Sequence, residues 1–129
     1  MRQLALAIIL AAVLTPAAQA QGLPLPEGVY VGADTGCADG HAGNTVEFGP
    51  FDDGYLLRWV TSYELLSGIA PTAEADVFEA VAVQGSTMPQ SQGEPRPVRI
   101  ELRGAEEFAM VEADGTVYPH LRRCGPLPD

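Results

Sequence analysis

The residues best suited to specific chemistry in this chain are two cysteines and two histidines. They occur in mirrored spacing as Cys37-x3-His41 and His120-x3-Cys124. Thiolate and imidazole are the ligands of tetrahedral zinc sites, so these four residues form a candidate metal site. Residues four apart in a strand, however, lie about 13 Å from each other, which is too far to share one ion. Zinc binding is therefore the weaker interpretation, and no cofactor is expected.

The stronger interpretation is a disulfide between Cys37 and Cys124, because the chain begins like an exported protein. Arg2 supplies a positive charge, residues 4–14 form an unbroken apolar run, and small residues follow at Ala18 and Ala20. This is the pattern of a secretory signal peptide. Exported proteins fold in oxidising compartments, where paired cysteines become disulfides.

We therefore expect a signal peptide over residues 1–20 and a single β domain over residues 21–129, located in the periplasm or secreted. The apolar run is too short to cross a bilayer as a helix, so no membrane anchor is expected after cleavage. The sequence is compatible with both the periplasm and the extracellular space, and with any oligomeric state.

Other groups of residues favour catalysis less. The loop 34–41 carries oxygen ligands but lacks the spacing of a known calcium loop. Adjacent carboxylates occur at Asp52-Asp53 and Glu106-Glu107. Neighbours in a strand point to opposite faces and cannot share one substrate, and Asp52-Asp53 is part of a predicted turn. None of the serines lies in a Gly-x-Ser-x-Gly motif. The sequence thus predicts a protein that is not an enzyme.

The charge of the chain restricts its partners. Without the signal it carries six arginines, no lysine and seventeen acidic residues, a net charge of −11. Such a surface repels phosphate backbones and anionic lipids, so nucleic-acid binding is not expected. It attracts cationic proteins, although high solubility alone would also explain it.

The clearest structural pattern is the alternation over residues 98–103. Aliphatic residues alternate there with charged ones, which predicts an antiparallel strand with one face in water. Asp52-Asp53-Gly54 and Asp114-Gly115 predict hairpin turns, the latter of type I′. With further candidate strands, the pattern favours seven to eight strands in a small antiparallel meander barrel or a sandwich, closed by one disulfide.

Three segments are less clear in the sequence. Residues 72–83 fit either a helix capped by Thr72 or a strand, and the parity of their valines favours the strand. Residues 63–71 fit a short helical turn or an edge strand. Residues 85–97 contain three prolines and two glycines and are expected to form a mobile loop.

The two ends of the predicted sheet resemble those of lipocalin-type barrels. Gly28-Val29-Tyr30 opens the first strand and Arg122-Arg123 ends the last. Lipocalin-type barrels begin with Gly-x-Trp and place a late arginine over that tryptophan. This chain has tyrosine at that position and is short for the family. The resemblance implies a closed barrel rather than a sandwich.

These observations favour an exported binding module that inhibits or sequesters a cationic protein. The candidate contact residues lie in acidic turns and in the predicted mobile loop: Asp34, Asp39, Asp52, Asp53, Met88 and Glu94. One alternative is a carrier of a small apolar ligand inside the barrel, with a pocket formed by Tyr30, Trp59 and Phe108. Another is an enzyme, which a pocket holding His41 or His120 against a carboxylate would support.

Overall fold

The computed structural model describes residues 22–129, so the predicted signal peptide over residues 1–20 lies outside the described residues. A single 3-10 turn, η1 (Cys37–Asp39), is the only helical element described; the rest of the regular structure is strand. The nine strands are β1 (Gly28–Gly32), β2 (Thr45–Phe51), β3 (Gly54–Arg58), β4 (Ser62–Pro71), β5 (Val77–Thr87), β6 (Gln90–Gln92), β7 (Arg96–Gly104), β8 (Glu107–Glu112) and β9 (Val117–Gly125).

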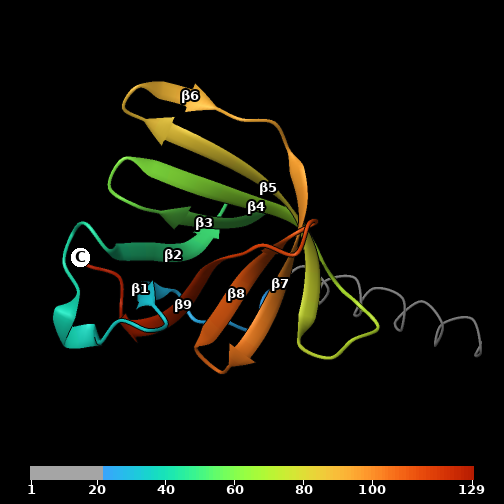
Figure 1. Cartoon of the computed structure of the whole chain (residues 1–129), viewed down its shortest axis with the longest axis horizontal. Helices are drawn as coiled ribbons and strands as arrows, with labels where there is room; N and C mark the ends of the chain where they lie inside the picture. Colours follow the sequence, from blue (N-terminus) through green and yellow to red (C-terminus); the bar gives the residue numbers. More distant parts are fainter. Residues whose placement is uncertain (1–21) are drawn as a thin grey trace, which may run out of the picture.

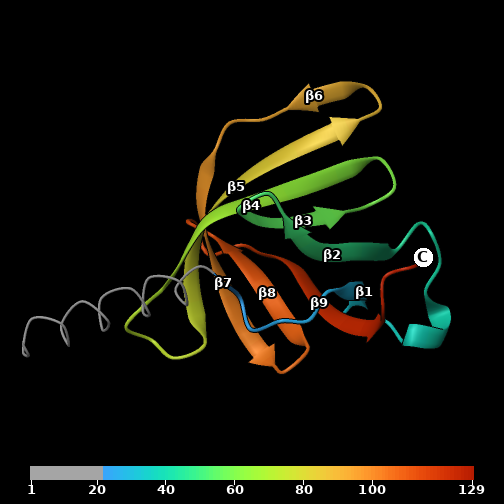
Figure 2. The ribbon, with the colours of Figure 1, turned by 180° about the vertical axis from the view of Figure 1, so that it is seen from behind.

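Eight of these strands form a closed antiparallel barrel (Figures 1 and 2). Neighbours in the chain pair with each other, β5 pairs with β7, and β1 closes the circle by pairing with β9. The short strand β6 pairs only with the end of β5, and this hairpin projects from the barrel. The predicted all-β fold is confirmed, and of the two predicted architectures the chain adopts the barrel.

The predicted alternation of buried and outward-facing residues over 98–103 is confirmed in β7. Val98 and Ile100 are buried in the barrel. On the outer face, Glu101 accepts hydrogen bonds from Arg99 at 2.8 Å and from Arg103 at 3.0 Å. The hydrogen bond from Arg99 is the main reason that the pKa of Glu101 is lowered.

Aromatic rings fill the centre of the barrel. Tyr30, Phe48 and Phe108 come from β1, β2 and β8, and each has an exposed fraction of 0%. Their ring centroids lie 5.2 to 5.6 Å apart in edge-on or tilted contacts, a favourable arrangement for aromatic pairs. An eight-stranded barrel is just wide enough to be filled by its own side chains, and this one is.

The segment before β1 seals one end of the barrel. Leu23 and Leu25 are buried in the core cluster. The Leu23 amide donates to the Tyr55 hydroxyl at 2.9 Å, and the Tyr30 hydroxyl donates to the Pro26 carbonyl at 2.6 Å. We call this the plugged end; it also carries the β2–β3, β4–β5 and β7–β8 connections. The opposite end, called the mouth, carries the β1–β2, β3–β4 and β8–β9 connections and the β5–β6 hairpin.

The disulfide between Cys37 and Cys124 is present and holds the loop after β1 against β9. Arg122 donates to the carbonyl of Thr35 in the same loop. Val31, on the outer face of β1, is buried with Gly40 of this loop close to its side chain. Because the two sulfur atoms are bonded to each other, they are not available as thiolate ligands, and the zinc interpretation is wrong.

The last arginine of β9 lies beside the first strand at the barrel seam. Arg123 is the direct partner of Tyr30 across β1 and β9. Its Nε donates to the carbonyl of Glu27 at 2.9 Å, beside Gly28, where any side chain would collide with it. The late arginine therefore lies at the first strand, as the resemblance implied, although the aromatic partner is tyrosine.

The two ambiguous segments are both strand. Strand β5 begins at Val77, and Thr72 does not cap a helix: its hydroxyl accepts from the Glu74 amide at 3.1 Å in a turn. Asp76 completes this turn at a positive φ of 64°. Strand β4 is neither a helical turn nor an edge, because it pairs with β3 on one side and β5 on the other.

The prediction of a long loop over residues 85–97 is wrong. Strand β5 continues to Thr87 and returns as β6, so only the turn at Met88-Pro89 and residues 93–95 are irregular. The glycine at 85 has a packing role, since a Cβ there would lie 2.0 Å from the ring of Tyr63. The Thr87 amide and hydroxyl also donate to the Thr61 carbonyl, which ties the hairpin to the β3–β4 connection.

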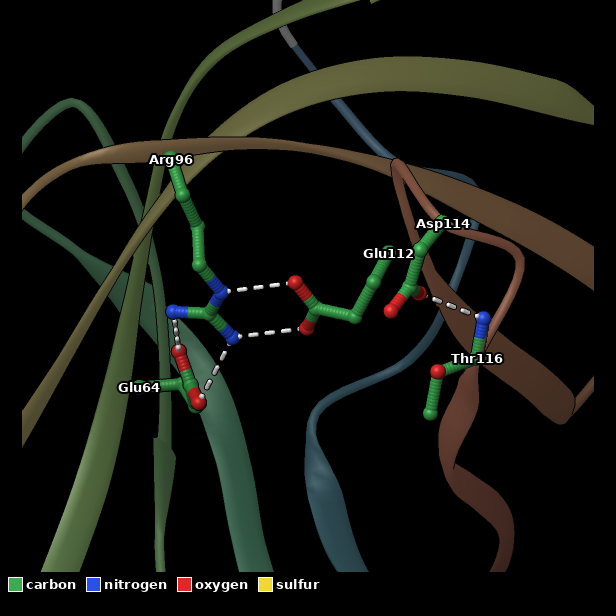
Figure 3. Close-up of polar contacts among 5 residues, drawn as sticks. All are labelled: Glu64, Arg96, Glu112, Asp114 and Thr116. Carbon is green, nitrogen blue, oxygen red and sulfur yellow. Dashed lines mark hydrogen bonds and ion pairs between the residues drawn. The ribbon is translucent and has the colours of Figure 1, made fainter.

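The turn between β8 and β9 is at the predicted place but of another type. Only Gly115 has positive φ, at 93°, and its amide donates to the Glu112 carbonyl at 2.9 Å. The Asp114 carboxylate accepts from the Thr116 amide at 2.9 Å, and this bond lowers its pKa (Figure 3). A three-residue hairpin loop has this form, rather than the two-residue I′ turn.

Replacing both Cys37 and Cys124 by serine should lower the free energy of unfolding by about 4 kcal/mol, because the bridge closes a loop with a sequence separation of 87. Urea unfolding of the oxidised protein and the double-serine variant measures the difference. Intact-mass analysis checks that the oxidised protein is lighter than the reduced one by two hydrogens. Equal stability of the two proteins would contradict the role assigned to the bridge.

The barrel should lose stability in alkali through Tyr30. Burial raises the pKa of its phenol from 10.0 to about 12, against a smaller opposing effect of Arg123. The unfolded phenol ionises first as the pH rises from 10 to 12, so stability falls over this range by up to about 3 kcal/mol. Tyr30→Phe should cost about 1 kcal/mol at pH 7 through the lost hydrogen bond.

The Tyr30→Phe variant should lose less stability than the wild type between pH 10 and pH 12. Urea unfolding across this range measures both slopes, and Tyr118→Phe, at an exposed tyrosine, is the matched control. An unchanged slope in the Tyr30 variant would show that another group causes the alkaline loss.

Candidate functional site

A hollow of about 720 Å³ lies at the mouth of the barrel. Its volume is in the range of sites that hold a small ligand or a large side chain. It is lined by the end of β1 and the loop after it, by Trp59 after β3, and by the start of β9. The lining residues used below are Asp34, Val46, Trp59, Glu107, Tyr118 and His120.

The wall formed by the loop after β1 is held by backbone hydrogen bonds as well as by the disulfide. The Ala33 amide donates to the His120 carbonyl at 2.9 Å, and the Thr35 amide donates to the Gly32 carbonyl at 2.8 Å. These bonds fix the backbone on both sides of Asp34, which is exposed at the rim. The loop therefore presents a carboxylate from a constrained position.

Two aromatic residues give the hollow an apolar side. Trp59 is half-buried and packs against the core, and its amide donates to the Ser62 carbonyl at 2.8 Å. Tyr118, the second residue of β9, is exposed. Val46, at the base, is buried. The hollow thus combines aromatic faces with carboxylates, which is a favourable environment for an organic cation.

His120 and Glu107 form a hydrogen-bonded pair in the lining. Nε2 of His120 lies 2.7 Å from Oε2 of Glu107, on the outer faces of the adjacent strands β9 and β8. A histidine oriented by a carboxylate is one part of a general-base arrangement. The hydroxyl groups that line the hollow belong to Thr35 and Tyr118, and neither is hydrogen-bonded to His120 in the described part of the chain.

The structure brings together only part of the predicted site residues. Asp34, Trp59 and His120 line the mouth hollow. Tyr30 and Phe108, predicted as pocket residues, are instead core side chains.

The remaining predicted contacts are exposed but spread over both ends. Asp39, Met88 and Glu94 lie in connections at the mouth, whereas Asp52 and Asp53 lie in the β2–β3 turn at the plugged end. His41 serves its own loop: its Nδ1 accepts from the Gly43 amide at 3.1 Å. Within residues 22–129 no group of three potential metal ligands was found.

A charged cluster inside the barrel was missed by the sequence reasoning (Figure 3). Arg96 donates to both oxygens of Glu64 at 3.1 and 3.2 Å and to both oxygens of Glu112 at 2.8 and 2.9 Å. Glu64 is the one buried charged residue described, with an exposed fraction of 6%. These hydrogen bonds, first that of Glu112, raise the pKa of Arg96.

The alternation of inward and outward residues along the strands could have predicted this cluster. Arg96 has the same parity as Val98 and Ile100, and Glu64 has the same parity as Leu66, so each faces inward near the mouth. The cluster joins β4, β7 and β8 across the barrel, and its role is to hold these strands together. The guanidinium of Arg96 makes four hydrogen bonds, all of them to these two carboxylates.

Among the described residues most arginines are paired with carboxylates, whereas most carboxylates have no cationic partner. Five of the six arginines in residues 22–129 are in ion pairs with carboxylates, and Arg122 donates to a carbonyl. Five of the seventeen carboxylates pair with arginines and Glu107 contacts His120, which leaves eleven with neither kind of partner in this part of the chain. These are Glu27, Asp34, Asp39, Asp52, Asp53, Glu74, Asp76, Glu79, Glu94, Asp114 and Asp129.

No protein-family model, curated protein or solved structure matches the chain significantly. Among the described residues there is no helix with the length and apolar character needed to cross a membrane.

Arg96→Met should destabilise the barrel by about 2–4 kcal/mol, because it leaves the buried carboxylate of Glu64 without its cation. Arg99→Met is the matched control, since Arg99 pairs with Glu101 on the outer face and its loss should cost less than about 1 kcal/mol. Urea unfolding measures both variants. Equal losses would mean that the inner cluster contributes no more than a surface ion pair.

Proposed function

We propose that this protein is an exported, non-catalytic binding module that inhibits or sequesters a cationic protein. The observation that supports this proposal most is the pattern of pairing among the charged side chains. Five of the six arginines of residues 22–129 are paired with carboxylates, while eleven carboxylates are left without a cationic partner among the described residues. A surface of this kind steers a basic partner towards it and raises the association rate.

The mouth is the end at which we place the contact. A lysine or arginine of the partner would enter the hollow that Trp59 and Tyr118 line together with Asp34 and Glu107. Asp39 and Glu94 add negative charge in neighbouring connections. The disulfide fixes the loop that carries Asp34, so little order has to be gained when the partner binds.

Export is part of the proposal. The disulfide is consistent with an oxidising compartment. The signal-like residues 1–20 point to the periplasm or the medium as the place of action.

The carrier alternative finds less support in the geometry, because aromatic side chains occupy the centre of the barrel where a ligand would lie. The enzyme alternative is favoured by one observation, the contact of His120 with Glu107 in the lining of a hollow. Both residues serve the binding proposal equally well, since Glu107 supplies a carboxylate and His120 orients it.

The test begins with the immobilised mature protein and the exported fraction of the source cells. We expect it to retain a protein with a basic isoelectric point and to release it in salt. The association rate should fall by about tenfold or more as salt screens the charges. A retained partner that is acidic, or binding that does not weaken in salt, would refute the proposal.

Two triple variants with the same change in charge test the placement at the mouth. Asp34→Asn, Asp39→Asn and Glu94→Gln together remove three charges at the mouth, whereas Glu27→Gln, Glu74→Gln and Asp76→Asn remove three at the plugged end. The first should slow association several times more than the second. Equal effects would mean that the charge acts only globally and that the mouth is not the contact.

A further inference from the structure

Three adjacent strands of the barrel carry aliphatic residues on their water-facing side. In each of them two apolar residues follow one another, so that one lies inside and the other outside. The inner members are Leu57, Leu66 and Ala82, which have exposed fractions of 2% or less. The outer members, which we call the outer stripe, are Leu56 of β3, Leu65 of β4 and Val83 of β5.

The outer stripe is continuous because its members are direct partners across the strands. Leu56 pairs with Leu65, and Leu65 pairs with Val83. Leu56 and Leu65 line a shallow hollow of about 430 Å³ on the outside of the barrel. Phe51 and Val60 border this hollow and have exposed fractions of 47% and 65%.

An antiparallel sheet that faces water on one side normally has polar residues there. Strands that are apolar on both sides are typical of sheets covered on both faces, and a cluster of exposed apolar residues marks an interaction site. Within residues 22–129, Phe51 and Val60 at the borders are left exposed, so this part of the chain does not cover the hollow.

We propose that the outer stripe binds an apolar side chain of the same cationic protein that the mouth binds; this inference rests on the proposed function. Charge selects the occupant. Asp52, Asp53 and Glu79 lie at the plugged-end side of the stripe without ion-pair partners, and Arg58, the positive residue of the hollow, is paired with Glu47. The fitting partner therefore has an apolar protrusion surrounded by lysine or arginine.

A second copy of this chain fits the stripe less well. Two copies would bring acidic borders against each other, and each copy carries a net charge of −11 without the signal. Like charges placed across an interface oppose association.

The outer stripe is connected to the mouth through one residue. Trp59 lines both the mouth hollow and the outer hollow, at the connection between β3 and β4. One partner can therefore lie across this rim, with a basic side chain in the mouth and an apolar side chain on the stripe. Such an arrangement combines an electrostatic contact, which raises the association rate, with an apolar anchor, which slows dissociation.

Two synthetic helical peptides of equal charge test the inference on the full folded protein. The first has leucines on one face and lysines on the other, and in the second every leucine is replaced by serine. We expect the leucine peptide to bind about tenfold more tightly and to shift the amide resonances of β3, β4 and β5 around the stripe. Equal affinities, or shifts confined to the mouth, would overturn the inference.

Variants separate the stripe from the charge effect. The double variant L56T/L65T should lower the affinity for the leucine peptide by about tenfold, and V81T should leave it unchanged. Val81 is a matched control, because it is an exposed aliphatic residue on the outer face of β5 that does not line the outer hollow. Equal effects of the two variants would also overturn the inference.

The same titrations distinguish failure of the inference from failure of the proposed function. Binding lost in salt and in the mouth triple variant, but kept in L56T/L65T, refutes the stripe and leaves the proposed function standing. Binding lost in L56T/L65T but insensitive to salt supports the stripe and refutes the cationic partner. Sedimentation of the wild type as a dimer that L56T/L65T converts to a monomer would assign the stripe to a second copy and overturn the inference.

Discussion

The closure between β1 and β9 is the constraint on which the rest of the molecule depends. Without it the sheet would have two long edges, each offering unpaired backbone groups to other chains. The pairing of Tyr30 with Arg123 and the bond between Cys37 and Cys124 hold this seam from both faces. Because Tyr30 also contacts Phe48 and Phe108, the seam and the aromatic core stabilise each other. The barrel is therefore closed by the same residues that fill it.

A filled and plugged barrel restricts where function can be located. Phe48 stacks on Tyr55, whose hydroxyl binds the backbone of Leu23, so the core continues into the segment that seals the plugged end. Ligand space is left at the mouth and on the outer faces of the strands. The charges also favour the surface, because five of the six described arginines are paired with carboxylates and the unpaired carboxylates face solvent. The geometry thus directs attention to surfaces rather than to the interior.

Local patterns in the sequence predicted most of the fold because strands and turns depend on near neighbours. The alternation in β7 and the aspartate–glycine turns are decided within a few residues. The β5–β6 hairpin was not predicted, because Gly85 is explained by the ring of Tyr63 and Thr87 is held by the Thr61 carbonyl, both more than twenty residues away. The inner cluster of Arg96 was missed for a similar reason: parity places it inside, but its two partners lie on other strands.

The candidate site depends still more on distant contacts, and this links it to the closure of the barrel. Asp34 and His120 are brought together because the seam places the end of β1 beside β9, and Trp59 joins them only when β3 completes the wall. The disulfide lies on the loop that carries the carboxylate, so the bond that closes the sheet also restricts the proposed binding surface. Order of this kind is gained on folding rather than on binding, which leaves more of the contact energy for affinity. A small acidic barrel can in this way present a rigid surface to a basic partner without an internal ligand cavity.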